Sequence, residues 1–195
     1  MSTSLTIHVR NLESQTQNFF FFQQPAVYAG GGQIYSNSLY TAPLANFHRS
    51  GSVLTFEVNV QYYAGIQQAH SPPAVGHNSG YFSVSRAIDL QPAQGSAHSW
   101  TKTTLDPLGL SASERGTGVQ PGAFRITTPM FSSPPFYNVG SAVEASGGIV
   151  LSNFVQANPN SITDCQPILK YYVQTGQYTP GTVMNFTQSC VNAAL

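Results

Sequence analysis

Hydrophobic and polar residues alternate with a period of two along several stretches of this chain, and the clearest case spans residues 53–63. Hydrophobic side chains occupy every second position from Leu54 to Tyr62, and polar side chains such as Glu57 occupy the positions between them. Because successive side chains of a strand point to opposite faces, this pattern predicts one long strand with one buried face.

Shorter stretches of the same kind predict further strands, separated by turns rich in glycine and proline. We expect these strands at residues 5–9, 81–85, 124–127, 168–175 and 182–188, and also near 18–23, 33–40, 98–104 and 148–155. The best helical segment, residues 111–114, is at most one turn because glycines follow it at once. We therefore predict that residues 1–195 form a single all-β domain, an antiparallel β-sandwich of jelly-roll-like form with about ten strands.

Several pairs of similar segments suggest an internal repeat. Residues 31–37 resemble residues 147–153, and residues 53–58 resemble residues 168–173. Two weaker matches precede them in the same order, at nearly constant spacing. These matches predict two five-strand halves, residues 1–95 and 119–195, which pack face to face around one core.

Four consecutive phenylalanines occupy positions 19–22 without a neighbouring charge. An exposed strand of this composition is prone to aggregate. We therefore expect this segment to be buried on both faces, either inside the domain or at a contact between subunits.

Charged residues make up only 7% of the chain, and seven Lys and Arg balance seven Asp and Glu. The absence of a basic surface argues against a nucleic-acid partner, and no apolar run is long enough for a membrane span. A net charge of zero favours association, so we expect a homo-oligomer, although an ordinary low-charge monomer fits the same composition. If Met1 is the native start, the lack of a signal-peptide pattern predicts a cytoplasmic protein.

The two cysteines, Cys165 and Cys190, flank a stretch that reads as a hairpin with its turn near residues 177–181. Folding about this turn would place the two cysteines nearly opposite each other, at a separation compatible with a disulfide. A cytosolic location would instead favour reduced thiols.

Few residues suit catalysis or metal binding, and we predict no catalytic group, metal or cofactor. His70 and His77 flank a proline-rich loop, but their spacing matches no strong metal-ligand pattern. They remain candidates for binding a ligand through this loop.

The aromatic residues are more suggestive, since the chain has ten Tyr, twelve Phe and one Trp. In the adjacent pairs at 62–63 and 171–172, one ring is expected to point inward and the other outward. Tyr63, Tyr172 and Trp100, with Tyr35 or Tyr40, would then form an outward platform for neutral sugars. The alternative is that these rings pack in the core or against a partner subunit.

These features favour a non-enzymatic binding or self-assembling protein that recognises neutral glycans through tyrosine-rich surfaces and loops. The alternative is an enzyme that acts on an apolar small molecule in a closed cavity, with His and Tyr as its working groups.

Overall fold

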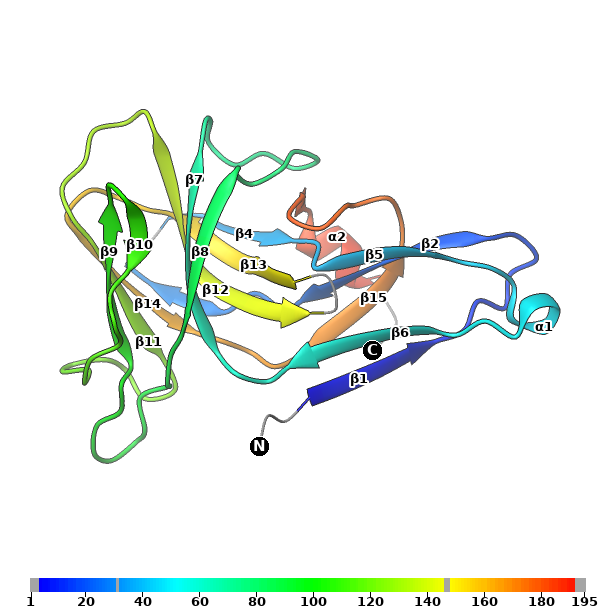
Figure 1. Cartoon of the computed structure of the whole chain (residues 1–195), viewed down its shortest axis with the longest axis horizontal. Helices are drawn as coiled ribbons and strands as arrows, with labels where there is room; N and C mark the ends of the chain where they lie inside the picture. Colours follow the sequence, from blue (N-terminus) through cyan, green and yellow to red (C-terminus); the bar gives the residue numbers. More distant parts are fainter. Residues whose placement is uncertain (1–3, 31, 146–147, 192–195) are drawn as a thin grey trace.

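A computed structural model of the chain describes residues 4–30, 32–145 and 148–191, with side chains described as far as Ser189. Across these residues the protein is all-β, with three sheets and two short helices (Figure 1). None of the described helices has the length and apolar character needed to cross a membrane.

The largest sheet has eight strands and runs through the middle of the molecule. Its order is β1 (Ser4–Val9), β6 (Leu54–Asn59), β12 (Phe136–Ala145), β13 (Gly148–Gln156), β4 (Ile34–Asn37) and β16 (Val183–Met184), and β12 also pairs with β7 (Tyr63–Ala69), which pairs with β8 (Phe82–Ala87). All of these pairings are antiparallel.

Two smaller sheets lie at opposite ends of this large sheet in Figure 1. One contains β10 (Leu108–Leu110), β9 (Trp100–Leu105), β11 (Phe124–Thr128), β14 (Ser161–Gln166) and β3 (Val27–Ala29), and the other contains β15 (Tyr171–Thr175), β2 (Gln17–Gln23) and β5 (Tyr40–Leu44). The pairing of β9 with β11 is parallel, which the expectation of a purely antiparallel fold did not include. The helices are α1 (Phe47–Ser50) and α2 (Phe186–Val191).

The stretch 53–63 is not one strand, as predicted, but the end of one strand and the start of another. The Asn59 side-chain oxygen accepts a hydrogen bond from the Gln61 N–H at 3.1 Å, a local bond typical of a turn. The chain therefore leaves β6, which pairs with β1, and begins β7, which pairs with β12 and β8.

The hairpin predicted around residues 177–181 is also wrong. Strand β15 pairs with β2, and β16 pairs with β4 in a different sheet. After β16 the Asn185 side chain accepts a hydrogen bond from the Gln188 N–H, and the chain enters α2 instead of continuing as a strand.

Strand pairing gives no support to the internal repeat. Strand β1 pairs with β6, whereas β11, its proposed counterpart, pairs with β9 and β14. Residues 31 and 147, with which two of the similar segments begin, lie outside the described residues.

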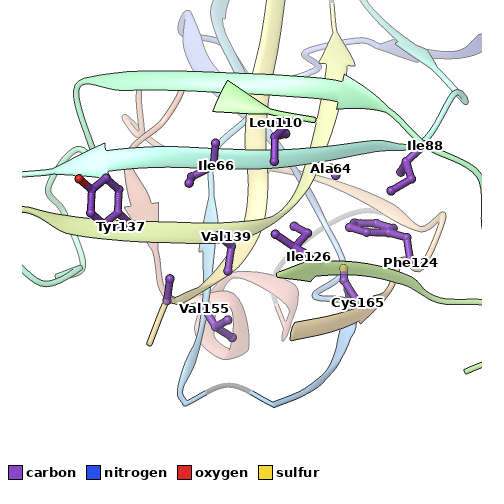
Figure 2. Close-up of a cluster of buried hydrophobic side chains, with 12 residues drawn as sticks. Ala64, Ile66, Ile88, Leu110, Phe124, Ile126, Tyr137, Val139, Val155 and Cys165 are labelled. Atoms are coloured by element: carbon purple, nitrogen blue, oxygen red, sulfur yellow. The ribbon is translucent and has the colours of Figure 1, made fainter. Parts of the chain in front are cut away.

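Two clusters of the hydrophobic core join the large sheet to a smaller one. In the first, Ile66 and Val139 of the large sheet face Phe124 and Ile126 of the five-stranded sheet (Figure 2). In the second, Phe56, Val58 and Val143 of the large sheet face Phe21 and Tyr171 of the three-stranded sheet. The central strand β12 therefore contributes to both clusters.

Three of the four phenylalanines at 19–22 are buried as predicted, whereas Phe19 is only partly buried. Phe20, Phe21 and Phe22 are each 1% exposed or less. Phe21 points to the second cluster, and its neighbours Phe20 and Phe22 point to a third, which also contains Tyr172 and Met184.

A buried polar seam, formed by Tyr28, Ser141 and Asn153, lies along β12 between Val139 of the first cluster and Val143 of the second. The Tyr28 hydroxyl donates to the backbone carbonyl of Asn153 at 2.6 Å and accepts from the Ser141 N–H at 3.1 Å. The Ala26 N–H donates to the Asn153 side-chain oxygen at 3.0 Å. Burial raises the pKa of Tyr28 well above its ordinary value. Since a β-bulge follows Ser141, the seam satisfies backbone groups at the place where the ladder is interrupted.

Candidate functional site

Three of the aromatic residues predicted to form one platform lie on three different sheets. Tyr63 belongs to the eight-stranded sheet, Trp100 to the five-stranded sheet and Tyr172 to the three-stranded sheet. The structure therefore does not bring them together.

Tyr172 does not point outward, because both faces of its sheet are covered. It is 7% exposed, its ring stacks on Phe22 at 5.3 Å, and Phe186 of α2 meets it edge-on at 5.5 Å. Its hydroxyl donates to the Gln24 side-chain oxygen at 2.9 Å. Tyr171, on the opposite face, is 7% exposed as well. Tyr172 is thus a core residue of this fold.

Tyr63 marks the point where β6 and β7 diverge. Its hydroxyl donates to Glu144 Oε2 at 2.9 Å, and Asn59 Nδ2 donates to the same oxygen at 2.8 Å. These two hydrogen bonds lower the pKa of the Glu144 carboxyl, whereas burial and the Glu144 partner raise the pKa of Tyr63. The polar end of Tyr63 is therefore already engaged within the protein.

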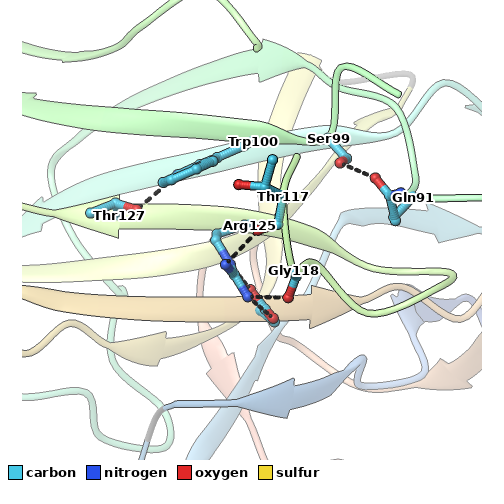
Figure 3. Close-up of polar contacts among 8 residues, drawn as sticks. Gln91, Ser99, Trp100, Thr117, Gly118, Arg125 and Thr127 are labelled. Carbon is cyan, nitrogen blue, oxygen red and sulfur yellow. Dashed lines mark hydrogen bonds and ion pairs between the residues drawn. The ribbon is translucent and has the colours of Figure 1, made fainter. Parts of the chain in front are cut away.

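Trp100 lies on the five-stranded sheet in a patch that also contains Arg125 (Figure 3). Its ring nitrogen donates to Thr127 Oγ1 at 2.8 Å. The Lys102 ammonium lies 5.2 Å from the ring centroid and the Arg125 guanidinium lies 5.8 Å from it. Both cations are within the range of cation–π attraction, so the Trp100 ring already interacts with side chains of the protein itself.

Arg125 forms the best-buried ion pair of this patch. Its Nε and Nη2 donate to the two oxygens of Asp164 at 2.6 and 2.8 Å, and the remaining donors reach the carbonyls of Thr117 and Gly118. Asp164 raises the pKa of Arg125 through these bonds. Because β11 and β14 are neighbours at this position, the pair ties adjacent strands together.

Replacing Arg125 with methionine should lower the free energy of unfolding by about 3–5 kcal/mol, because the nearly buried Asp164 carboxylate would lose its counter-ion. Lys102→Met is the matched control, since Lys102 forms an exposed ion pair with Glu114 on the same sheet. That variant should lose less than about 1 kcal/mol. Urea unfolding measures both variants. Equal losses of stability would show that the buried ion pair contributes no more than the exposed one.

Cys165 is a free thiol in the interior of the five-stranded sheet. Burial raises the pKa of this thiol to about 12, so it stays protonated and unreactive at neutral pH. The side chain of Cys190 lies outside the described residues. The predicted proximity of the two cysteines depended on the hairpin that the structure does not form, so the disulfide loses its geometric basis.

His70 and His77 lie on the loop that joins β7 to β8, as the sequence indicated. In Figure 1 this loop projects toward the segment between β15 and α2. The Gly76 N–H donates to the Val183 carbonyl at 2.8 Å, and the Val183 N–H donates to the His77 carbonyl at 2.9 Å. His77 therefore helps to fix the loop through its backbone.

Ser79 anchors the end of the loop to the large sheet. Asn37 Nδ2 donates to Ser79 Oγ at 2.8 Å, and Asn138 Nδ2 donates to the Ser79 carbonyl at 2.9 Å. All three residues are at most 1% exposed. At the adjacent Gly80, an added Cβ would lie 2.5 Å from the Gln68 carbonyl, so only glycine allows this close approach.

A pocket of about 440 Å³ opens between this loop and the end of β7. On its wall the rings of His70 and Tyr81 stack with centroids 4.0 Å apart and planes 12° apart. Both residues are exposed, Tyr81 by 53%. The lining contains no Lys, Arg, Asp or Glu and consists of Ala69, His70, Ser71, Asn78, Ser79, Gly80 and Tyr81.

Tyr81 and Asn78 were not among the residues predicted from the sequence. The loop between two strands, with its prolines and flanking histidines, did indicate the region. Within the part of the chain that the structure describes, no group of three or more His, Cys, Asp or Glu is placed to hold a metal ion.

Comparison with known proteins found no matching family, no similar curated protein and no similar solved structure. A proposal for the function therefore has to rest on the chemistry of the His70–Tyr81 pocket.

Proposed function

We propose that this protein is a non-enzymatic binding protein that holds a neutral sugar in the His70–Tyr81 pocket. The observation that supports this most is the exposed, stacked aromatic pair on the wall of a pocket whose lining has no charged carboxylate, lysine or arginine.

The lining chemistry matches a neutral polyhydroxylated ligand. One face of the Tyr81 ring is covered by His70, and the opposite face can meet the C–H groups of a sugar ring. The Ser71 hydroxyl can exchange hydrogen bonds with sugar hydroxyls, and Asn78 Nδ2 can donate to them, while Asn78 Oδ1 accepts a hydrogen bond from the Gly80 N–H. A charged sugar would find no counter-ion here and would lose hydration on entry.

The pocket is also largely preformed. Tyr81 follows two residues, Ser79 and Gly80, whose positions are fixed by buried hydrogen bonds and close packing, and the Tyr81 N–H donates to the Gln68 carbonyl at 3.0 Å. A fixed wall needs little ordering when a ligand binds, which favours measurable affinity from a small contact area.

We expect Tyr81→Ala to weaken binding of a neutral glycan by about tenfold or more, since the stacking surface is lost. A neutral-glycan array identifies the ligand, and calorimetry compares the variants. Phe82→Ala is the matched control: Phe82 is the next residue and is 51% exposed, but it does not line the pocket. Equal affinity of Tyr81→Ala and the unaltered protein, or no glycan binding at high protein concentration, would contradict the proposal.

The alternative, an enzyme acting on an apolar molecule in a closed cavity, has no comparable support. The pocket that holds His70 is open to solvent along its exposed aromatic pair, and no carboxylate lines it to orient a catalytic histidine. Homo-oligomer formation remains a separate prediction from the neutral composition.

We further infer that the three sheets are arranged as a sandwich, with the eight-stranded sheet as one layer and the two smaller sheets covering it. The two core clusters support this arrangement, because each combines residues of the large sheet with residues of one smaller sheet.

A further inference from the structure

Two more depressions lie near the His70–Tyr81 pocket, and both are lined by Tyr178. One, of about 350 Å³, is lined by Gly76, Gln177, Tyr178, Thr179 and Thr182. The other, of about 560 Å³, is lined by Phe20, Gln174, Thr175, Tyr178, Thr187, Gln188 and Ser189. Among the described residues neither lining contains Lys, Arg, Asp or Glu, a feature that both depressions share with the first pocket.

Tyr178 is held firmly between these two depressions. Its half-buried ring meets the buried ring of Phe20 edge-on at 5.1 Å. Its carbonyl accepts hydrogen bonds from the hydroxyls of Ser38 and Thr41. Its own hydroxyl forms no hydrogen bond within the described ranges, which leaves the polar end of a rigid aromatic wall available to a ligand.

The first pocket and the Tyr178 depressions are separated by a single pair of backbone segments. Asn78 lines the His70–Tyr81 pocket and forms an antiparallel bridge with Thr182, which lines the 350 Å³ depression. The Ser79 N–H also donates to the Gly181 carbonyl at 2.9 Å. Paired segments lie about 5 Å apart, a distance comparable with the length of one sugar ring.

We infer that these three depressions are successive subsites of one groove and that the ligand is a linear neutral oligosaccharide. This inference rests on the proposed function and extends it from a single sugar to a chain. Tyr81 provides one aromatic station and Tyr178 provides a second, while the uncharged hydroxyls and amides between them suit a polymer that carries no charge.

The test compares short and long ligands of the same sugar. The probes are glucose with cellohexaose and maltohexaose, mannose with mannohexaose, xylose with xylohexaose, and N-acetylglucosamine with chitohexaose, each titrated by calorimetry. At least one hexasaccharide should bind about tenfold or more tightly than its monosaccharide. Tyr178→Ala should remove this difference, whereas Tyr81→Ala should weaken the binding of both ligands.

Because Tyr178 packs on Phe20, a second variant leaves that contact intact. Thr179→Arg places a long charged side chain at the exposed rim of the 350 Å³ depression. This variant should also remove the preference for the hexasaccharide. Phe82→Ala is the control and should change neither affinity. If both Tyr178→Ala and Thr179→Arg keep the chain-length preference, the extended groove is wrong and the single-sugar pocket stands. If no probe binds, the proposed function itself fails for these sugars, and the extended groove fails with it.

Discussion

Replacing Gly140 with alanine should lower the free energy of unfolding by about 3 kcal/mol, at the upper end of the cost of overpacking a core. An added Cβ would lie 2.3 Å from the Asn153 carbonyl oxygen, 2.4 Å from the Tyr28 hydroxyl and 2.7 Å from the Phe154 Cα. Two of these atoms belong to the backbone of the neighbouring strand β13, and the third is fixed by its hydrogen bonds. The central pair of strands would have to separate to admit a methyl group.

Further variants test the cause of this loss, and urea unfolding measures the stability of each. Gly32→Ala is the control, since an added Cβ meets nothing within 4 Å there, and it should cost less than about 1 kcal/mol. Combining Gly140→Ala with Tyr28→Phe removes the hydroxyl but not the backbone clash, so stability should not return to that of Tyr28→Phe alone. A Gly140→Ala protein as stable as Gly32→Ala would show that β12 and β13 do not approach each other closely at Gly140.

The same strand shows why the sequence predicted the fold class better than the strand order. Periodicity located many of the strands, including β1, β9 and β13, because each has a clear alternating or apolar pattern. Strand β12 is central and buried on both faces, yet its small and polar residues, with Gly140 and Ser141 in the middle, resemble a turn. Small residues are needed there because Tyr28 and β13 approach so closely, and nothing in the local sequence reveals that approach.

The candidate site was predictable only in part, for a similar reason. A proline-rich loop flanked by His70 and His77 pointed to the region in which the proposed pocket lies. The partner of His70 is Tyr81, eleven positions later, which becomes its neighbour only because β7 and β8 form a hairpin. Tyr172 was expected to face outward because alternation assigns a face but cannot reveal that Phe186 of α2 covers it.

The few charges are distributed in a way that fits the proposed function. Arg125 with Asp164 and Lys102 with Glu114 form ion pairs on the five-stranded sheet. The His70–Tyr81 pocket and the Tyr178 depressions contain no such residue in their linings. On the proposed function, the low charge content is consistent with uncharged linings, and these two ion pairs lie on a separate sheet.

Replacing Phe21 with alanine should cost about 3–5 kcal/mol, the usual loss for a fully buried phenylalanine. Phe21 is 0% exposed and stacks on Phe56 of the large sheet with centroids 4.3 Å apart and planes 16° apart. It therefore joins the three-stranded sheet to the large sheet, and its removal would leave a cavity that the flanking strands β15 and β5 hold open. Urea unfolding of the variant measures the loss.

Phe82→Ala is again the control, because its half-exposed ring should contribute less than about 1 kcal/mol. The comparison also tests the arrangement of the sheets, since Phe21 has this weight only if the three-stranded sheet packs against the eight-stranded one. Equal stability of the two variants would mean that this packing is absent. A large loss of stability for Phe21→Ala alone would support the inferred sandwich. It would also support the fixed position of β2, because Phe20, next to Phe21 on this strand, packs against Tyr178 of the proposed groove.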